Sequence, residues 1–561
     1  MELFAVYGFR GHSRPVRRTG AAATRAAGLI ALSLVTGLVP ARTPARAAPP
    51  PRAAVGGPGV PAVIGDWPGE ELDEGLTLYR GTLGDPSGPG RWTVTVRVPG
   101  DRPGELGGRA DASELALRLH AAGFDARVEA VPWSGYEGAG DAPLGWRVRV
   151  GAYGTRAQAA AQVRRLKSAG YPAGADWTRT DPVEVDPRGG HSARVRVAIL
   201  DPRRYRGEVT ASYGRALALP ETTTSMARAA GATLAVNGGY FVLHEEDGLT
   251  GTPAGIGVYD GEVESLATNG RAALLLGDRP RVARLFTAMT VVAGRRRREI
   301  DGVNRTPGLV RNCGGVGGDS PTQAPRHDVT CTDPSEIVLF TPALGRHTPE
   351  GDGVEVVLDG EGRVVERRPR GGPVPDGGRV LAGIGEGAAW LSAYAWPGVR
   401  LGVRLRVCDE DGRAVDLGDA DVVNGGPWLV RDGRVDVDVV SDGVLYAENP
   451  AFFYTWGIKR NPRVMVGIDR WDRLILVTAD GRRPGYSDGL SLLEGARFLR
   501  ELGAVEGINL DGGGSVSLAV RGRLDNRPSD EEGERSVGDA LLFLPPPEGK
   551  GGGRPAYSGP G

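Results

Sequence analysis

Four short segments of the chain combine polar side chains with glycine at the ends of apolar stretches. They lie at 235–241, 423–427, 479–482 (followed by Ser487) and 508–515. A strand that ends in Asn-Gly-Gly or Asp-Gly-Gly-Gly presents a polar side chain beside a backbone that lacks Cβ, so a ligand can approach closely and meet N–H groups. One such segment is typically a turn. Four of them favour a constructed binding site.

The length and charge of the chain limit what such a site would bind. The 561 residues exceed one ordinary core, so we expect two or more domains. The formal net charge of -1 gives no sign of a nucleic-acid binder. Lysine occurs only at Lys167, Lys459 and Lys550, so nearly all positive charge is arginine. The planar guanidinium group of arginine binds phosphate through two hydrogen bonds, which makes it the better phosphate ligand.

The N-terminus has the pattern of an export signal. Five arginines precede an apolar run at 26–39, and Ala45-Arg46-Ala47 is a small-x-small cleavage site. We expect a signal peptide at 1–47, with an uncleaved membrane anchor as the alternative. The mature protein would then be secreted, extracellular or associated with the cell wall, and would have no membrane contact. Residues 48–75 are rich in Pro, Gly and Ala and are interpreted as a linker.

The chain has three cysteines. Cys313 and Cys331 flank a Gly/Asp/Pro-rich stretch, and an oxidising compartment would allow a disulfide between them. Cys408 lies in an alternating strand pattern and is expected to be a buried thiol. No spacing of cysteine or histidine indicates a metal or redox site.

An internal repeat organises residues 91–180. R-L-H-A-A-G-F at 118–124 matches R-L-K-S-A-G-Y at 165–171, and each copy ends an expected helix that follows an alternating strand. The result is a βαββαβ, ferredoxin-like unit. Its second half resembles the SPOR domain, and residues 91–180 are called the SPOR-like module below. The resemblance implies binding to peptidoglycan glycan strands; the alternative is a spacer that binds nothing.

Residues 193–546 have a different sequence pattern. Asp-Gly pairs recur between alternating segments, which predicts a large β-rich α+β domain. One helix is clear, because Ser491-x-x-Glu494 forms a capping box and Gly503 closes the apolar face. The fold class expected for the chain is therefore α+β, and residues 547–561 are expected to be a disordered tail.

The large domain resembles the phosphodiester glycosidases, the family related to the lysosomal mannose-6-phosphate uncovering enzyme. The four segments carry the resemblance together with V-N-R at 303–305, N-P-R-V-M-V-G-I-D at 461–469, Y-S-D-G-L-S-L-L-E-G-A at 486–496 and N-R-P-S-D-x-x-G-E-R at 526–535. Val423-Asn424 and Val464-Met465 depart from the usual pattern. The resemblance implies hydrolysis of a sugar-1-phosphodiester to a free sugar and a phosphomonoester.

That reaction assigns roles to residue types. A carboxylate near the anomeric carbon acts as nucleophile or base, and we expect Asp511 to be this group with Asp480 as its partner. The leaving phosphate is already acidic, so it needs charge stabilisation, for which Arg482, Arg463 and Arg305 are candidates.

The remaining site residues are expected to bind the sugar. Asn237, Asn424 and Asn509 would orient hydroxyls, and Ser515 would support Asp511. The glycines would admit the ligand to the backbone: Gly238, Gly239, Gly425, Gly512 and Gly513. No cofactor is expected to be required, and a divalent cation at Asp480 and Asp511 stays an alternative.

Two other functions stay open at this stage. One is a non-catalytic peptidoglycan-binding protein of the cell envelope, against which the intact D-G-R and N-L-D-G-G-G-S segments argue. The other is a factor in exopolysaccharide biosynthesis.

Overall fold

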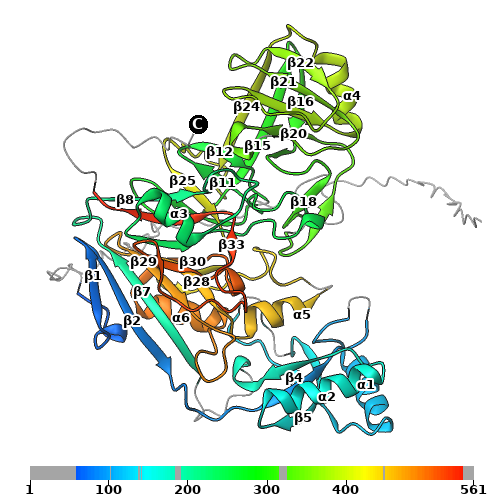
Figure 1. Cartoon of the computed structure of the whole chain (residues 1–561), viewed down its shortest axis with the longest axis vertical. Helices are drawn as coiled ribbons and strands as arrows, with labels where there is room; N and C mark the ends of the chain where they lie inside the picture. The colour runs from blue at the N-terminus through cyan, green and yellow to red at the C-terminus, as the bar shows by residue number, and fades with distance from the viewer. Residues whose placement is uncertain are drawn as a thin grey trace, which may run out of the picture. The chain divides into compact units, whose positions relative to one another are not determined.

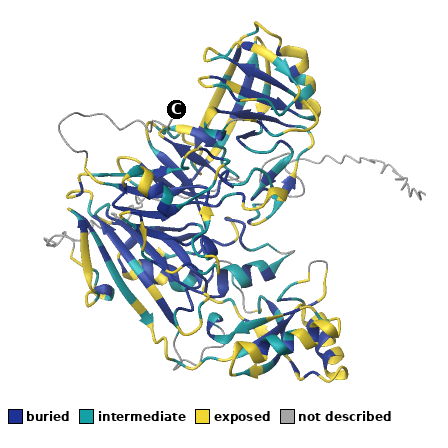
Figure 2. Ribbon diagram, in the orientation of Figure 1, coloured by how far each residue is buried: buried dark blue, intermediate teal, exposed yellow. Residues whose placement is uncertain are grey.

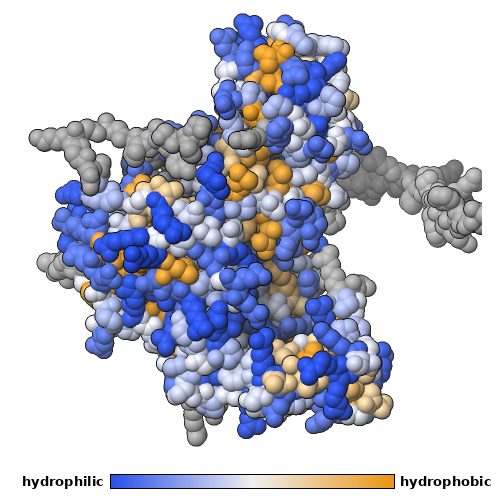
Figure 3. All heavy atoms as spheres, in the orientation of Figure 1, coloured by the Kyte–Doolittle hydropathy of each residue, from blue (hydrophilic) through white to orange (hydrophobic). Residues whose placement is uncertain are grey.

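The structure is a computed structural model that describes residues 59–546, except 101–102, 137–138, 140–141, 183–190, 269, 315–324, 346 and 447–448. The expected signal peptide and C-terminal tail lie outside the described residues. The fold is α+β and mostly strands, as predicted (Figure 1). Among the helices that the structure describes, none is both long and apolar enough to cross a membrane. The visible face is largely hydrophilic, with apolar residues in scattered groups (Figure 3).

An antiparallel sheet of eight strands forms the centre of the large domain. Its order is β1 (Gly69–Asp73), β2 (Leu76–Gly84), β7 (Ser192–Leu200), β29 (Leu474–Ala479), β28 (Arg463–Asp469), β30 (Ala504–Asn509), β26 (Trp428–Arg431) and β27 (Arg434–Val435). Alternation sends Val197 and Met465 to one face, where helix α6 (Leu492–Glu501) packs. Ala198 and Val464 point to the other face, toward two further sheets.

These two sheets complete the core on the second face. One has the order β32 (Arg523–Leu524), β31 (Leu518–Val520), β10 (Leu234–Asn237), β34 (Ala540–Leu544), β8 (Glu208–Ser212); α3 (Thr223–Ala230) covers it. The other has the order β12 (Glu262–Ser265), β11 (Gly257–Tyr259), β25 (Asp421–Asn424), β13 (Ala272–Leu276), β14 (Arg281–Arg284). Leu274, Val236 and Ile508 share one cluster, so the three sheets are packed together.

The first two strands correct the expected domain boundaries. Residues 69–84 were assigned partly to a linker, but they form β1 and β2, and β2 pairs with β7 from Leu76↔Leu200 to Gly84↔Ser192. Ile64, in the short helix η1 (Ala62–Ile64), is fully buried. The SPOR-like module is therefore an insertion between two neighbouring strands of the central sheet, and the large domain begins well before residue 193.

The SPOR-like module has the βαββαβ order that the repeat predicts. Its sheet has the order β4 (Ala126–Val131), β5 (Gly145–Tyr153), β3 (Trp92–Val96), β6 (Ala173–Trp177). The helices α1 (Arg109–Ala121) and α2 (Arg156–Ser168) close its separate core. The Thr155/Gln158 capping box is present, but α1 starts at Arg109 after an N-cap Gly108 that has no side chain to cap it.

A smaller β-rich part lies between residues 286 and 408. It contains β16 (Arg296–Ile300), β15 (Phe286–Ala293) and β24 (Leu401–Cys408), and a sheet with the order β17 (Gly302–Val303), β20 (Ile337–Phe340), β23 (Arg379–Gly383), β21 (Val354–Leu358), β22 (Val364–Arg368). Helix α4 (Gly385–Tyr394) packs on β23 and β21. Figure 2 shows buried strands at the centre of this part and exposed positions at its margins.

Candidate active site

A cleft of about 430 Å³ opens where several chain segments meet. Four aromatic side chains form one wall, and their rings contact each other: Tyr240, His327, Phe452 and Trp456. Asp511, Ser515 and Arg535 also line the cleft, together with Phe241, Leu243, His244, Asp247, Arg311, Asn312 and Asp328. The first and the fourth Gly-rich segments therefore converge on one cleft.

Asn237 fixes the backbone of Asp511. Its Nδ2 donates to the Asp511 carbonyl oxygen over 2.9 Å, and its Oδ1 accepts from the Ser517 amide over 3.1 Å. The Asp511 amide donates to the Gly238 carbonyl oxygen. Because both ends of its amide are used and the residue is buried, Asn237 orients the reacting strand and not a sugar hydroxyl, which corrects the prediction.

Asn424 and Asn509 also hold protein groups instead of facing the cleft. Asn424 binds the backbone of Tyr240 at both its amide, over 3.0 Å, and its carbonyl, over 3.2 Å. Asn509 donates from Nδ2 to the Tyr240 hydroxyl over 2.9 Å and is fully buried. Together these asparagines fix the position of the Tyr240 ring in the aromatic wall.

Three of the predicted glycines serve the packing of the segments on each other. A Cβ on Gly239 would come within 2.7 Å of Asn424, and one on Gly425 within 2.8 Å of the Asn509 carbonyl oxygen. A Cβ on Gly238 would collide with the Asp539 carboxylate. The close approach expected of a ligand is here an approach of protein to protein.

Asp511 is the predicted catalytic residue that the structure brings into the cleft. It is partly exposed, and burial raises the pKa of its carboxyl to about 6. The Ser515 hydroxyl, the Gly512 amide at 2.9 Å from Oδ1 and the charge of Arg535 oppose this shift, whereas Asp539 adds to it. A carboxyl with such a pKa changes charge close to neutral pH.

Two arginines flank the glycine run after Asp511. Both terminal nitrogens of Arg482 lie 3.3 Å from the place where Gly513 would carry a Cβ, and Arg535 fills the corresponding place at Gly514. Arg482 donates from Nε to Asn461 Oδ1 over 2.9 Å, and Arg535 pairs with Asp530. The glycine run thus makes room for two guanidinium groups next to the segment that carries Asp511.

Asp480 does not share the cleft with Asp511. Its Oδ2 accepts from Arg196 Nη1 and from the Tyr486 hydroxyl, each over 2.8 Å, and its Oδ1 accepts from Asn526 Nδ2 over 3.1 Å. The side chain is fully buried in this network. The structure therefore does not bring Asp480 into the cleft with Asp511, and its role as the partner of Asp511 stays a prediction.

The expectation that no cofactor is required, and the alternative of a divalent cation near Asp480 and Asp511, stay predictions. The described parts of the chain contain no group of three or more His, Cys, Asp or Glu side chains arranged to hold a metal ion.

Arg482 is not among the residues that line the cleft, and the other two predicted phosphate ligands also lie outside this lining. Arg305 forms a two-pronged ion pair with Glu336, which is itself buried, so it stabilises the smaller β-rich part. Arg463 is fully buried behind Trp456 and donates to the carbonyl oxygens of Leu490 and Trp456. Its Nη1 has no hydrogen-bond partner among the described residues, and burial lowers its pKa to about 10.

Sequence reasoning missed His327, Trp456 and Arg535. Burial and the nearby charges of Arg271 and Arg311 hold the pKa of His327 well below its ordinary value, so the imidazole is neutral at pH 7. Arg535 lies inside the N-R-P-S-D-x-x-G-E-R segment, which was available as a signal. His327 and Trp456 follow no pattern that marks a site.

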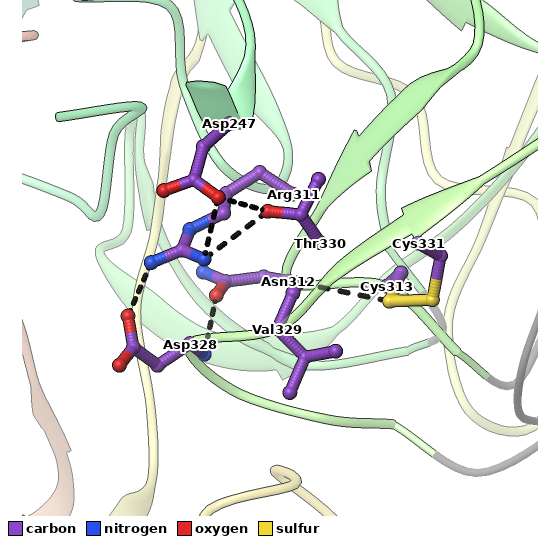
Figure 4. The surroundings of a disulfide bond; sticks show 8 residues. All are labelled: Asp247, Arg311, Asn312, Cys313, Asp328, Val329, Thr330 and Cys331. Atoms are coloured by element: carbon purple, nitrogen blue, oxygen red, sulfur yellow. Dashed lines mark hydrogen bonds and ion pairs between the residues drawn. A yellow bond between two sulfur atoms is a disulfide. The ribbon is translucent and has the colours of Figure 1, made fainter. Parts of the chain in front are cut away.

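The predicted disulfide between Cys313 and Cys331 is present, and Cys408 is a buried free thiol. The disulfide lies at the end of a hairpin made of β18 (Leu309–Arg311) and β19 (Thr330–Thr332). Figure 4 shows Arg311 of this hairpin between Asp247 and Asp328, all three of which line the cleft. The disulfide therefore anchors one rim of the cleft.

The fold and the cleft define a β-rich α+β protein whose cleft brings Asp511 together with guanidinium groups and an aromatic wall. The chain matches the phosphodiester glycosidase family over residues 352–544 and the SPOR domain over residues 104–176. It therefore contains a phosphodiester glycosidase domain and a SPOR domain.

Individual relatives agree with this assignment. The chain is 37% identical over 111 residues to the N-acetylglucosamine-1-phosphodiester alpha-N-acetylglucosaminidase of Mus musculus and 32% identical over 110 residues to that of Homo sapiens. Each match covers 19% of this chain and 21% of the relative, so the chain spans about a fifth of the length of these curated proteins.

A solved structure matches over a much longer stretch. It is a protein of Burkholderia pseudomallei K96243 described as exported, with 30% identity and a TM-score of 0.77, over 85% of this chain and 96% of that one. This share is too large for residues 193–546 alone, so the likeness extends beyond them.

Proposed function

We propose that the protein hydrolyses the bond between the anomeric carbon of a sugar and a phosphodiester oxygen, releasing the free sugar and a phosphomonoester. The observation that carries the proposal is the position of Asp511 in the cleft, with Arg535 in the same lining and Arg482 against the glycine run that follows Asp511. The match to the phosphodiester glycosidase family over residues 352–544 supports the same reaction.

The chemistry follows from the two kinds of group. Above pH 6 Asp511 is mostly ionised, and its carboxylate attacks the anomeric carbon or activates a water molecule through an oxocarbenium-like transition state. The departing phosphate gains negative charge, which guanidinium groups stabilise. The aromatic wall at Tyr240 and Trp456 offers apolar faces to the sugar ring.

We further propose that the sugar is an α-linked N-acetylglucosamine, which the names of the curated relatives support. The test is purified protein incubated with α-N-acetylglucosamine 1-(methyl phosphate), with released sugar measured. p-Nitrophenyl α-N-acetylglucosaminide, whose leaving group is uncharged, serves as the comparison. Release of sugar from neither compound, by folded protein over a range of pH, would overturn the proposal.

We also propose that the mature protein is exported and that its SPOR domain brings it to peptidoglycan. The N-terminal sequence and the description of the Burkholderia relative as exported support export, and the family match supports peptidoglycan as partner. Co-sedimentation of the protein with amidase-treated sacculi tests the second part. Equal sedimentation with untreated sacculi and with an unrelated polysaccharide would leave the spacer interpretation.

A further inference from the structure

The sheet of the SPOR-like module has a polar face that the large domain covers. The helices α1 and α2 pack on the other face. The polar face carries Thr95, Arg147, Arg149 and Asp176, and the two arginine side chains are 1% and 0% exposed. Arginine is rarely fully buried unless it is paired, so we expect a role for the groups of the large domain that cover these two side chains.

Two residues of the large domain reach into this polar face. The Tyr454 hydroxyl donates to Asp181 Oδ2 over 2.8 Å, and Arg147 donates to the same hydroxyl. The ammonium group of Lys459 lies 2.8 Å from both Glu105 and Asp176. These are charge-assisted bonds between buried groups, which hold geometry more strongly than bonds at a surface.

Neighbouring contacts extend the attachment along the same segment. The ring of Tyr136 packs edge-on against Phe453 at 4.9 Å, and its hydroxyl donates to the Gly457 carbonyl oxygen. The Arg460 amide donates to the Thr180 carbonyl oxygen over 2.6 Å. The module thus holds residues 453–460 at several successive positions.

The same segment forms the aromatic wall of the cleft on its other side. Phe452 lies in α5 (Pro450–Phe453; Figure 1), and Trp456 lies in the π-helix η5 (Tyr454–Ile458). Both residues line the cleft. π-Helical turns are rare and are frequently found at functional sites. In η5 it lets Tyr454 face the module while Trp456 faces the cleft.

We propose that the SPOR-like module is a positioning element of the cleft: through Tyr454 and Lys459 it fixes the segment that presents Phe452 and Trp456 to the substrate. A glycan strand that used the polar sheet face would have to displace these two residues. Binding of the module to such a strand and the shape of the cleft are therefore coupled. Only the kinetic part of the test rests on the proposed function.

Hydrogen exchange tests the positioning without any substrate. Lys459→Met and the conservative Tyr454→Phe should each speed exchange of the amides in 453–461 by at least about threefold, because the local opening becomes easier. Lys167→Met on the exposed face of α2 and Tyr171→Phe, whose hydroxyl donates to the Arg118 carbonyl oxygen, are the matched controls and should leave that segment unchanged. Lys459→Arg should restore most of the protection.

Kinetics on α-N-acetylglucosamine 1-(methyl phosphate) give the second readout. The two interface variants should raise KM about fivefold or more with kcat within about twofold, because the wall binds the sugar and does not react. Unchanged exchange in 453–461 for both folded interface variants overturns the proposal. If the wild-type protein turns over neither probe, the proposed function fails while the exchange experiment still decides the positioning.

Discussion

Replacing Asp511 by asparagine should make the protein more stable at neutral pH. Its carboxyl has a pKa of about 6 in the folded protein and an ordinary value of 3.8, so the folded state binds the proton more tightly than the unfolded state. Ionisation therefore disfavours folding as the pH rises from about 4 to above 6. The Asn237 contacts use only the backbone of residue 511, so the variant keeps them.

The magnitude follows from the shift of about two pKa units. Each unit corresponds to about 1.4 kcal/mol, which gives an upper bound of about 3 kcal/mol at pH 7.5 and about 0.6 kcal/mol at pH 4. Solvent at the partly exposed carboxyl screens some of this, so we expect a gain of about 1–3 kcal/mol at pH 7.5.

Urea denaturation of wild type and Asp511→Asn at pH 7.5 and at pH 4 measures both values. Asp525→Asn provides a control of opposite sign, because the Arg80 and Arg196 side chains lower the pKa of that carboxyl, and its replacement should destabilise the protein at pH 7.5. Equal or lower stability of Asp511→Asn at pH 7.5, with no dependence on pH, would refute the reasoning that burial in the cleft disfavours the ionised form of this carboxyl.

Further predictions concern the rest of the site. With Asp511 acting in its ionised form, kcat/KM should fall about tenfold per unit as the pH drops below about 6 and level off above it, and a pH profile without this limb would exclude that role. Arg482→Lys keeps the charge but loses the two-pronged hydrogen bonding of the guanidinium group. The value of kcat/KM should therefore fall at least about tenfold more for the phosphodiester than for the aryl glycoside, and equal losses would make Arg482 structural. Asp480→Asn removes one of the two carboxylates that pair with Arg196 and should lower stability by about 2 kcal/mol in urea, whereas a change in activity alone would return Asp480 to the site. Cys313→Ser opens the loop to Cys331 and should lower stability by about 3 kcal/mol and loosen the rim that holds Arg311, which a melting curve and KM report.

The sequence predicts those features that depend on local pattern. The repeat ending at Gly123 and Gly170 predicted the βαββαβ module, and the Ser491/Glu494 capping box predicted α6. The sequence left open whether residues 75–83 pair with the large sheet, because the pairing of β2 with β7 joins residues that the whole module separates and a Gly/Pro-rich context hides the alternation of Leu76 and Leu78.

The site was predictable in outline but not in its roles. Gly-rich strand ends indicated where segments meet, yet Asn237 and Asn424 turned out to bind neighbouring segments, which only their three-dimensional partners reveal. Asp480 and Asp511 look alike in sequence, and only their three-dimensional surroundings distinguish them, since Arg196, Tyr486 and Asn526 all donate to Asp480. Trp456 enters the cleft through the π-helical turn, a feature without a sequence signature here.

Turnover of α-N-acetylglucosamine 1-(methyl phosphate) by folded Asp511→Asn protein tests the central claim most directly. The side chain keeps its size but loses the charge that attacks or activates water, so kcat/KM should fall at least about 10²-fold, or roughly 3 kcal/mol in the barrier. Folded Asp511→Asn protein that hydrolyses the compound at the wild-type rate would contradict the claim that Asp511 is the reacting carboxylate.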